Sequence, residues 1–192
     1  MKKIEVEIRV WLKDRQEIEN KLISLGAKVI YVSHLVDYWF CPKSITNCED
    51  ALIDNVGFAL RIRESEDAYS GLKVASLECK KLFDGKDHSL CHEHEIVIGD
   101  VSGMKAILDD IGLKNFLIVD KERIVYKYKD VKFCFDKLRG LGDGLEIEVM
   151  TEDNLSETKE KIINMALELG IKKEEILEKS LTYLAMQKLG KF

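Results

Sequence analysis

The chain has 192 residues, and its 46% hydrophobic content is enough for a packed core, which excludes a disordered protein. Charged residues make up 34% of the chain, yet the formal net charge is only -5, so the basic surplus that general nucleic-acid binding requires is missing. The five cysteines include no C-x-x-C pair, which excludes a zinc ribbon and argues against a disulfide framework.

The segment IEVEIRVWL, residues 4–12, is predicted to be a strand with one apolar and one charged face. Ile4, Val6 and the apolar residues that follow point one way, whereas two glutamates and an arginine point the other way. This acidic, alternating start lacks the apolar core of a signal peptide, and no later run is long enough to cross a bilayer. We therefore expect a cytoplasmic protein that is not bound to a membrane.

A helix is predicted next, in DRQEIENKLISLGAK, because Asp14 can cap it, Glu17 follows three residues later, and Gly26 ends it. Residues 28–40 then alternate and are rich in β-branched and aromatic residues, which is typical of a strand. Pro42 opens a loop that is expected to run to about residue 55.

The rest of the chain alternates between strand and helix patterns. Strands are expected at 57–65, 72–83, 91–99, 116–129, 131–138 and 144–150, with a hairpin turn at 84–89. Helices are expected at 101–113, with Ala106, Ile107 and Ile111 facing inward, and at 155–170 and 172–190. Because no linker interrupts the pattern, we predict one α+β domain, residues 1–192, built on an antiparallel sheet.

Charged residues recur two positions apart on the strands, always opposite an apolar face. One such face is usually a solvated sheet surface, but a whole set of nearly all ionisable positions suggests another arrangement. If the sheet closes into a barrel, these faces line a polar channel and the helices cover the apolar outside. The positions are Glu5, Glu7, Arg9, Arg61, Arg63, Lys80, Glu93, Glu95, Lys121, Arg123, Asp136, Glu146 and Glu148.

The mixture of charges indicates a ligand class. Guanidinium and ammonium groups bind phosphoryl oxygens, and clustered carboxylates call for a divalent cation between them. Mg²⁺ or Mn²⁺, which prefer oxygen ligands, suit that place. A polyphosphate with its metal would satisfy both sets of side chains.

The same residues resemble the CYTH proteins, or triphosphate tunnel metalloenzymes, most of all the class IV adenylyl cyclases. The family signature Glu-x-Glu-x-Lys is matched by Glu5-Val-Glu7-Ile-Arg9, in which arginine replaces lysine. VDYWF, ALRIRE, LECKK, HEHEIVIGD, VDKERIVY and FDKLRGLGDGLEIEVMTED follow in the expected order and cover most of the chain. The resemblance implies a closed eight-stranded antiparallel β-barrel with helices packed outside, including C-terminal helices at about 155–190 that cover it.

The resemblance also implies roles for the charged positions. Glu5, Glu7 and Glu146, helped by Glu148 and Glu95, would hold the metal. The phosphates would be held by Arg9, Arg61, Arg63, Lys80, Lys121 and Arg123. Catalytic roles fall to Arg9, Lys121 and Asp136, the last of which would position an attacking group or a second metal. The family's Lys-Gly-Pro turn is replaced by CKKLF, so Lys73 or Lys81 could take the place of Lys80.

Three functions are compatible with such a tunnel. The segment GLGDGLEIEVMTED, residues 140–153, is most similar to class IV adenylyl cyclases, which convert ATP to cyclic AMP and pyrophosphate. The resemblance to these cyclases also suggests a homodimer. Hydrolysis of tripolyphosphate, thiamine triphosphate or a nucleoside triphosphate is the alternative, and both reactions depend on positioning and charge neutralisation. A non-catalytic binder of polyphosphorylated ligands fits less well, because the carboxylates suited to a metal are present.

Overall fold

The protein is described by a computed structural model over residues 4–84 and 87–189. Its strands are β1 (Ile4–Leu12), β2 (Lys28–Pro42), β3 (Ala59–Asp67), β4 (Lys73–Leu82), β5 (Leu90–Ile98), β6 (Leu113–Tyr128), β7 (Val131–Leu138) and β8 (Gly142–Thr151). Its helices are α1 (Arg15–Ser24), α2 (Ile53–Val56), α3 (Val101–Asp110), α4 (Leu155–Glu168) and α5 (Leu181–Leu189), with short 3-10 turns at Glu49–Ala51 and Lys173–Glu175.

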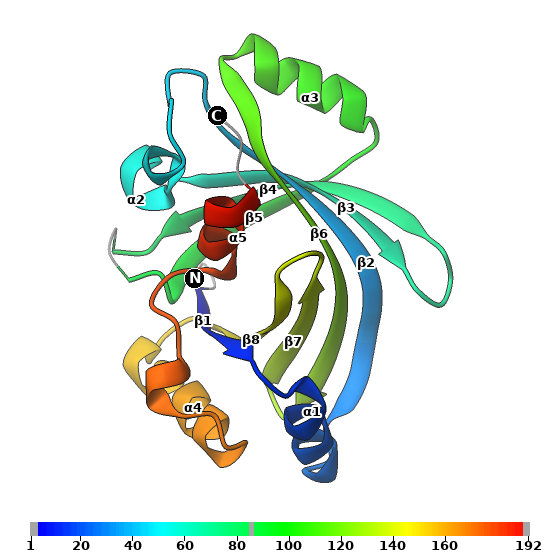
Figure 1. Cartoon of the computed structure of the whole chain (residues 1–192), viewed down its shortest axis with the longest axis vertical. Helices are drawn as coiled ribbons and strands as arrows, with labels where there is room; N and C mark the ends of the chain where they lie inside the picture. Colours follow the sequence, from blue (N-terminus) through cyan, green and yellow to red (C-terminus); the bar gives the residue numbers. More distant parts are fainter. Residues whose placement is uncertain (1–3, 85–86, 190–192) are drawn as a thin grey trace.

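The strands form a closed antiparallel barrel in the order β1-β5-β4-β3-β2-β6-β7-β8 (Figure 1). Every strand expected from the sequence is present, and closure brings β1, at the start of the chain, against both β5 and β8. The fold class predicted from the resemblance is therefore confirmed. The predicted turn at 84–89 includes residues 85 and 86, which lie outside the described residues.

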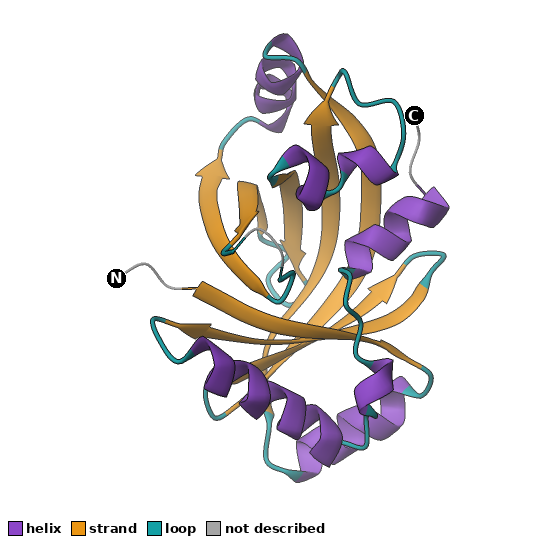
Figure 2. Cartoon of the chain, turned by 90° about the vertical axis from the view of Figure 1, so that its left-hand side faces the viewer, coloured by secondary structure: helices purple, strands orange, loops and turns teal. Residues whose placement is uncertain are grey.

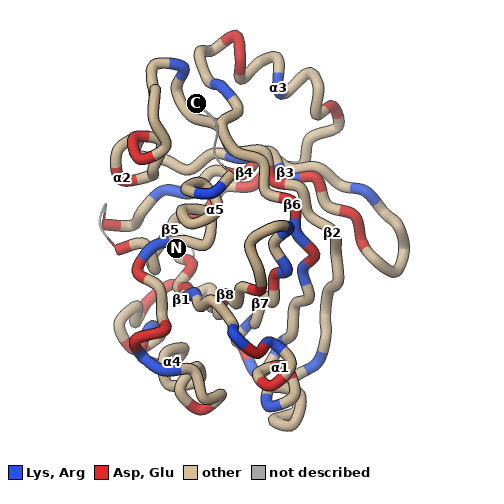
Figure 3. The backbone as a smooth tube through the Cα atoms, viewed as in Figure 1, with Lys and Arg blue, Asp and Glu red and all other residues tan. Residues whose placement is uncertain are grey.

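The two faces of β1 lie as predicted, with the charged face turned into the barrel. Val6, Ile8 and Val10 pack outward in one core cluster with Leu22 of α1 and Ile162 of α4. These outer helices are visible beneath the barrel in Figure 2. The charges therefore lie inside because the helices bury the opposite, apolar side, and Figure 3 shows basic and acidic positions distributed along the strands around the barrel.

The predicted inner face of the helix at 101–113 is wrong. Ile107 and Ile111 are 54% and 68% exposed, whereas Leu108 is buried and Met104 packs beside it. The sequence period allowed either face, and the apolar side chains of β2, β3 and β6 under α3 select the face that carries Leu108.

The predicted helix at 172–190 is also wrong in its first half. Ile176 forms a β-bridge with Val10, and the backbone N–H of Leu177 donates to the carbonyl of Arg9 at 2.8 Å, so the chain is extended there. Apart from the 3-10 turn at Lys173–Glu175, the segment is helical only in α5, from Leu181. It lies over one mouth of the barrel in Figure 1, whereas α4 packs on the outer wall as expected.

Within the described residues, no helix is both long and apolar enough to cross a membrane.

Candidate functional site

The barrel encloses a cavity of about 640 Å³, a size typical of small-molecule sites. All eight strands contribute to its walls. The acidic and basic side chains that line it are Glu5, Glu7, Arg9, Arg61, Arg63, Glu78, Lys80, His88, Glu93, Glu95, Arg123, Lys132, Glu146, Glu148 and Lys179.

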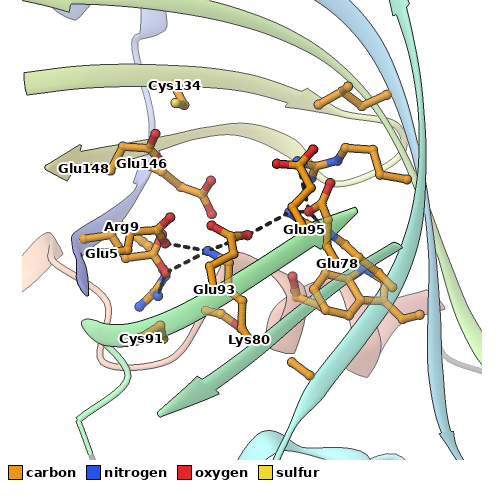
Figure 4. Close-up of a pocket in the computed structure, with 18 of the residues that line it drawn as sticks. Glu5, Arg9, Glu78, Lys80, Cys91, Glu93, Glu95, Cys134, Glu146 and Glu148 are labelled. Carbon is orange, nitrogen blue, oxygen red and sulfur yellow. Dashed lines mark hydrogen bonds and ion pairs between the residues drawn. The ribbon is translucent and has the colours of Figure 1, made fainter. Parts of the chain in front are cut away.

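One wall carries a cluster of carboxylates from β1 and β8, which we call the acidic cluster: Glu5, Glu7 and Glu148. Their ligand oxygens lie within 4.8 Å of one another. Glu7 is the direct cross-strand partner of Glu148, an arrangement of like charges that is unfavourable without a cation. Figure 4 shows Glu5 and Glu148 on the same side of the cavity.

The electrostatics of the acidic cluster fit a divalent cation. Burial, together with the neighbouring Glu93 and Glu148, raises the pKa of Glu5 to about 7 even though Lys80 lies beside it. Burial likewise raises the pKa of Glu7, against the effect of Arg9. Buried carboxylates with too little positive charge around them are the oxygen donor set that Mg²⁺ or Mn²⁺ takes. The acidic cluster can therefore bind a metal ion.

The other predicted metal ligands lie elsewhere in the cavity. Glu146 accepts a hydrogen bond from the Nη2 of Arg123 at 2.6 Å. Burial would raise the pKa of Glu146, but Arg123 and Lys121 hold it well below its usual range. Glu95 lines the cavity and is exposed. Neither belongs to the group of carboxylates whose oxygens converge within 4.8 Å.

The facing wall carries paired guanidinium groups on β3. Arg63 donates two hydrogen bonds to Asp37 of β2, at 2.6 and 2.8 Å, and the Nε of Arg61 donates to Glu78 of β4 at 2.6 Å. Burial would raise the pKa of Asp37, but Arg63 and Arg61 hold it far below its usual range. These carboxylates fix the two arginines, since each arginine stands directly opposite its acidic partner in the sheet.

Arg123 is fixed in the same way from β6. Its Nε and Nη2 each donate to Asp136 at 2.5 Å, and Lys121 donates to the same carboxylate at 2.7 Å. Lys121 and Asp136 are buried and are not among the residues that line the cavity. Both therefore lie behind Arg123, and they would influence a bound substrate only by positioning Arg123.

Arg9 and Lys80 reach into the acidic side of the cavity. Arg9 forms an ion pair with Glu7 and also donates to the carbonyl of His88 at 2.7 Å. The Nζ of Lys80 donates to Glu5 at 2.5 Å, as Figure 4 shows. Lys73 and Lys81, the alternatives to Lys80, are exposed and do not line the cavity. The structure thus places Lys80 inside.

Sequence reasoning missed several charged residues that line the cavity, and also Asp37, which lies behind the lining. Glu78 shares its strand face with Lys80, so its parity could have revealed it. Asp37, in the VDYWF segment, has no charged residue two positions away. Its role is recognised only from its ion pairs with Arg61 and Arg63 on β3. Lys132, whose Nζ donates to Glu148 at 3.1 Å, has no signal of its own. His88 and Lys179 come from segments outside the strands.

The cysteines and histidines of the cavity region do not add a metal site. Cys91 and Cys134 line the cavity, but burial raises the pKa of Cys91 to about 12 and that of Cys134 even further, so both thiols stay protonated. His92 and His94 are not among the residues that line the cavity, in agreement with the strand parity.

The family model of the CYTH domain matches residues 3–181. A protein of Methanocaldococcus jannaschii named "putative adenylate cyclase" is 29% identical over 192 residues, which span 97% of this chain and 99% of that protein. A Pyrococcus horikoshii protein, PH1819, has a similar structure with a TM-score of 0.81 and 26% identity, covering 96% of this chain and 99% of its own.

A more distant structure comes from Hippeastrum, with a TM-score of 0.60, 18% identity, and coverage of 97% of this chain and 95% of its own. It is described as a "putative adenylyl cyclase" with a dominant triphosphatase activity. At this identity the similarity shows the shared fold.

Proposed function

Since the chain belongs to the CYTH family, we propose that it is a metal-dependent enzyme that converts ATP to cyclic AMP and pyrophosphate inside the barrel. The name of the Methanocaldococcus jannaschii relative supports the choice of reaction. The arrangement of charge in the cavity supports the choice of a triphosphate.

The observation that carries the proposal is the separation of charge across the cavity. β8 and β3 stand four places apart in a ring of eight strands, so Glu148 faces the wall of Arg61 and Arg63. The acidic cluster provides oxygen ligands on one side, and fixed guanidinium groups provide paired donors on the other. A metal-bound triphosphate between the two walls neutralises both.

Beyond the acidic cluster and the arginines of β3, the cavity continues along apolar side chains at both ends, among them Val74, Met150 and Met186. Inorganic tripolyphosphate has no apolar part that could contact these side chains. A nucleoside triphosphate does, and this supports an organic substrate.

The chain's own residues would promote cyclisation by binding and orientation. Arg61, Arg63 and Arg123 would hold the β- and γ-phosphates, whose charge grows as pyrophosphate leaves. The ribose 3′-oxygen forms a bond to the α-phosphorus, the bond from that phosphorus to the β-phosphate oxygen breaks, and the hydroxyl proton passes to solvent. Asp37, Glu78 and Asp136 keep the guanidinium groups in place, so little reorganisation is needed during the reaction.

Glu5, Glu7 and Glu148 would hold the metal ion, with Lys80 and Arg9 beside them. When bound, a divalent ion neutralises phosphate charge and stabilises the entering and leaving oxygens.

Hydrolysis of a triphosphate is the second candidate. It is supported by the triphosphatase activity in the description of the Hippeastrum structure. The same walls would bind the substrate, and a water molecule in place of the ribose hydroxyl would attack phosphorus.

The test is to incubate the purified protein separately with ATP and with tripolyphosphate, each with Mg²⁺ or Mn²⁺, and to separate the products. We expect cyclic AMP and pyrophosphate from ATP. Orthophosphate together with ADP from ATP, or together with pyrophosphate from tripolyphosphate, and no cyclic AMP would establish the triphosphatase instead. No turnover of either compound with either metal would refute both. Glu7→Gln serves as the inactive reference for contaminating enzymes.

A further inference from the structure

One histidine lies in the wall of the cavity. His88 belongs to the turn between β4 and β5, and among the described residues it is the only histidine that lines the cavity. The ordinary pKa of histidine lies close to neutral pH, so this side chain can take up and release a proton under physiological conditions. Both proposed reactions remove a proton from an attacking hydroxyl group, and a histidine at the right place can accept it.

The turn holds His88 beside the acidic cluster. The backbone N–H of Glu7 donates to the carbonyl of Ser89 at 2.9 Å, which fixes the residue next to His88 against β1. Arg9 forms an ion pair with Glu7 and donates to the carbonyl of His88 at 2.7 Å. Figure 4 shows Arg9 and Glu5 together on this side of the cavity. One guanidinium group therefore connects the backbone of His88 to a proposed metal ligand, so the histidine stands close to the place of a metal-bound triphosphate.

A carboxylate orients the imidazole ring. Oδ1 of Asp54, on α2, lies 2.7 Å from Nε2 of His88, and Oδ2 accepts a hydrogen bond from Lys179 at 2.6 Å. Nζ of Lys179 lies 3.4 Å from the same Nε2. Because a carboxylate accepts hydrogen bonds, the proton of the neutral imidazole is assigned to Nε2, and Nδ1 keeps its lone pair. Within the described part of the chain, Nδ1 has no hydrogen-bond partner, so it is available to a bound ligand.

The groups around His88 favour a neutral imidazole beside a permanent carboxylate. Burial lowers the pKa of His88 despite the nearby Asp54, and the positive charges of Lys179 and Arg9 lower it further. Burial would raise the pKa of Asp54, but Lys179 and His88 hold it below its usual range. The thiol of Cys91, which donates to the carbonyl of His88 at 3.8 Å, stays protonated and adds no charge. A neutral imidazole can accept a proton, and the carboxylate stabilises the imidazolium that forms.

The same groups connect the cavity to solvent. The side chain of His88 is 11% exposed, whereas those of Asp54 and Lys179 are 31% and 42% exposed. A proton taken up by His88 inside the cavity can therefore leave to water on the side of Asp54, away from the phosphates.

We propose that His88 is the general base of the reaction, with Asp54 as its positioning residue. In cyclisation, the ribose 3′-oxygen forms a bond to the α-phosphorus while its proton passes to Nδ1 of His88. The bond from that phosphorus to the bridging oxygen breaks, pyrophosphate leaves with the electron pair, and the imidazolium then gives the proton to solvent. The inference rests on the proposed function and deepens it, and the same base would serve an attacking water in hydrolysis.

The test compares His88→Gln with His34→Gln in the full chain. The amide nitrogen of glutamine can still donate to Asp54, but glutamine has no basic nitrogen. His34 is a matched control, because its Nε2 also lies 2.7 Å from an aspartate, Asp120, while its side chain is 48% exposed and does not line the cavity. The values of kcat and KM for ATP are measured from about pH 5 to pH 9, at saturating Mg²⁺ so that the metal ligands stay occupied. Calorimetry with Mg²⁺-tripolyphosphate and thermal unfolding report binding and folding.

We expect His88→Gln to lower kcat at pH 7 about 100-fold, with KM and tripolyphosphate binding unchanged. In the unchanged protein, kcat should fall as the pH drops below the ordinary histidine value of 6.5, because the imidazole is then protonated. This loss at acidic pH should be absent from His88→Gln. Added imidazole should restore part of kcat to His88→Gly, in which the space of the ring is vacant. His34→Gln should behave as the unchanged protein does.

Three results would overturn the inference: an unchanged kcat in His88→Gln, the same loss of kcat at acidic pH in that variant, or no effect of imidazole on a folded His88→Gly. Loss of tripolyphosphate binding in His88→Gln would also overturn it and would make His88 a purely structural contact of the cavity wall.

The outcome separates the inference from the proposed function. If His88→Gln forms cyclic AMP at the full rate, the cyclase stands and the general base fails. If the unchanged protein releases only orthophosphate with ADP, and His88→Gln slows that release, the general base stands and the cyclase fails. If the unchanged protein turns over neither ATP nor tripolyphosphate, both are refuted.

Discussion

Two sets of buried carboxylates belong to the barrel wall, one lining the cavity and one behind its lining, and their surroundings shift their pKa values in opposite directions. Burial raises the pKa values of Glu5 and Glu7, and the positive charge around them does not offset it. Asp37 and Asp136 are equally buried, but each contacts two or more cationic side chains, and their pKa values are held below the usual range. The first set is short of positive charge, whereas the second is fully neutralised.

The comparison shows that the residue type alone does not define a carboxylate's role. Carboxylates short of positive charge are suited to bind an added cation. Fully paired carboxylates are suited to hold arginines in place, so that the arginines can meet an anion. Substitutions in the two sets should therefore affect different properties of the protein.

The largest effect is expected for Glu5→Gln and Glu7→Gln. Each removes a metal ligand, and turnover should fall by about 1,000-fold, or roughly 4 kcal/mol in transition-state stabilisation. The fold should survive, because a neutral amide is easier to bury than a carboxylate. Product formation and Mn²⁺ binding by calorimetry measure both effects. Glu122→Gln, at an exposed position on β6, is the control, and full activity in both cluster variants would contradict the metal assignment.

Asp37→Asn should act mainly on stability. It leaves the buried Arg63 without its carboxylate partner and should lower the free energy of unfolding by about 3 kcal/mol. The lowered pKa of Asp37 makes its stabilising effect complete above the ordinary aspartate pKa of 3.8 and lost as the pH falls below it. Urea unfolding at pH 7 and pH 3 tests this. The difference between the unchanged protein and Asp37→Asn should shrink at the lower pH.

Arg61→Ala and Arg123→Ala should weaken binding of a triphosphate by about 30-fold each, roughly 2 kcal/mol for the loss of a charged hydrogen bond. Calorimetry with Mg²⁺-tripolyphosphate measures the change without any contribution from a base. Arg139→Ala removes an arginine that is 83% exposed and does not line the cavity. This control variant should bind tripolyphosphate as tightly as the unchanged protein does. Unchanged affinity in both cavity variants would restore a purely structural role for these arginines.

The smallest effect concerns neighbouring lysines on β4. Lys80→Met should weaken tripolyphosphate binding about tenfold, because its ammonium group lies in the cavity beside Glu5. Lys81→Met changes an exposed residue on the other strand face and should leave binding unchanged. An effect of Lys81→Met that equals the effect of Lys80→Met would show that the lysine register in solution differs from the structure.

Local patterns determined the strands and their two faces. The alternation in β1 already separated Val6 and Ile8 from Glu5 and Glu7, because side chains in a strand point to opposite sides every second residue. The same rule placed Arg61, Arg63 and Arg123 on the charged face. Barrel closure was anticipated from the ordered motifs of the family resemblance.

The tertiary structure decided which charges meet. Asp37 is buried beside Arg61 and Arg63, and Lys132 lies beside Glu148, because of the register in which neighbouring strands pair. The same is true of the C-terminal segment: helix propensity favoured a long helix, but the bridge between Ile176 and Val10 interrupts it and directs α5 over the mouth of the barrel. Periodicity is a local property, whereas register and closure result from long-range packing, and the sequence pattern alone does not contain them.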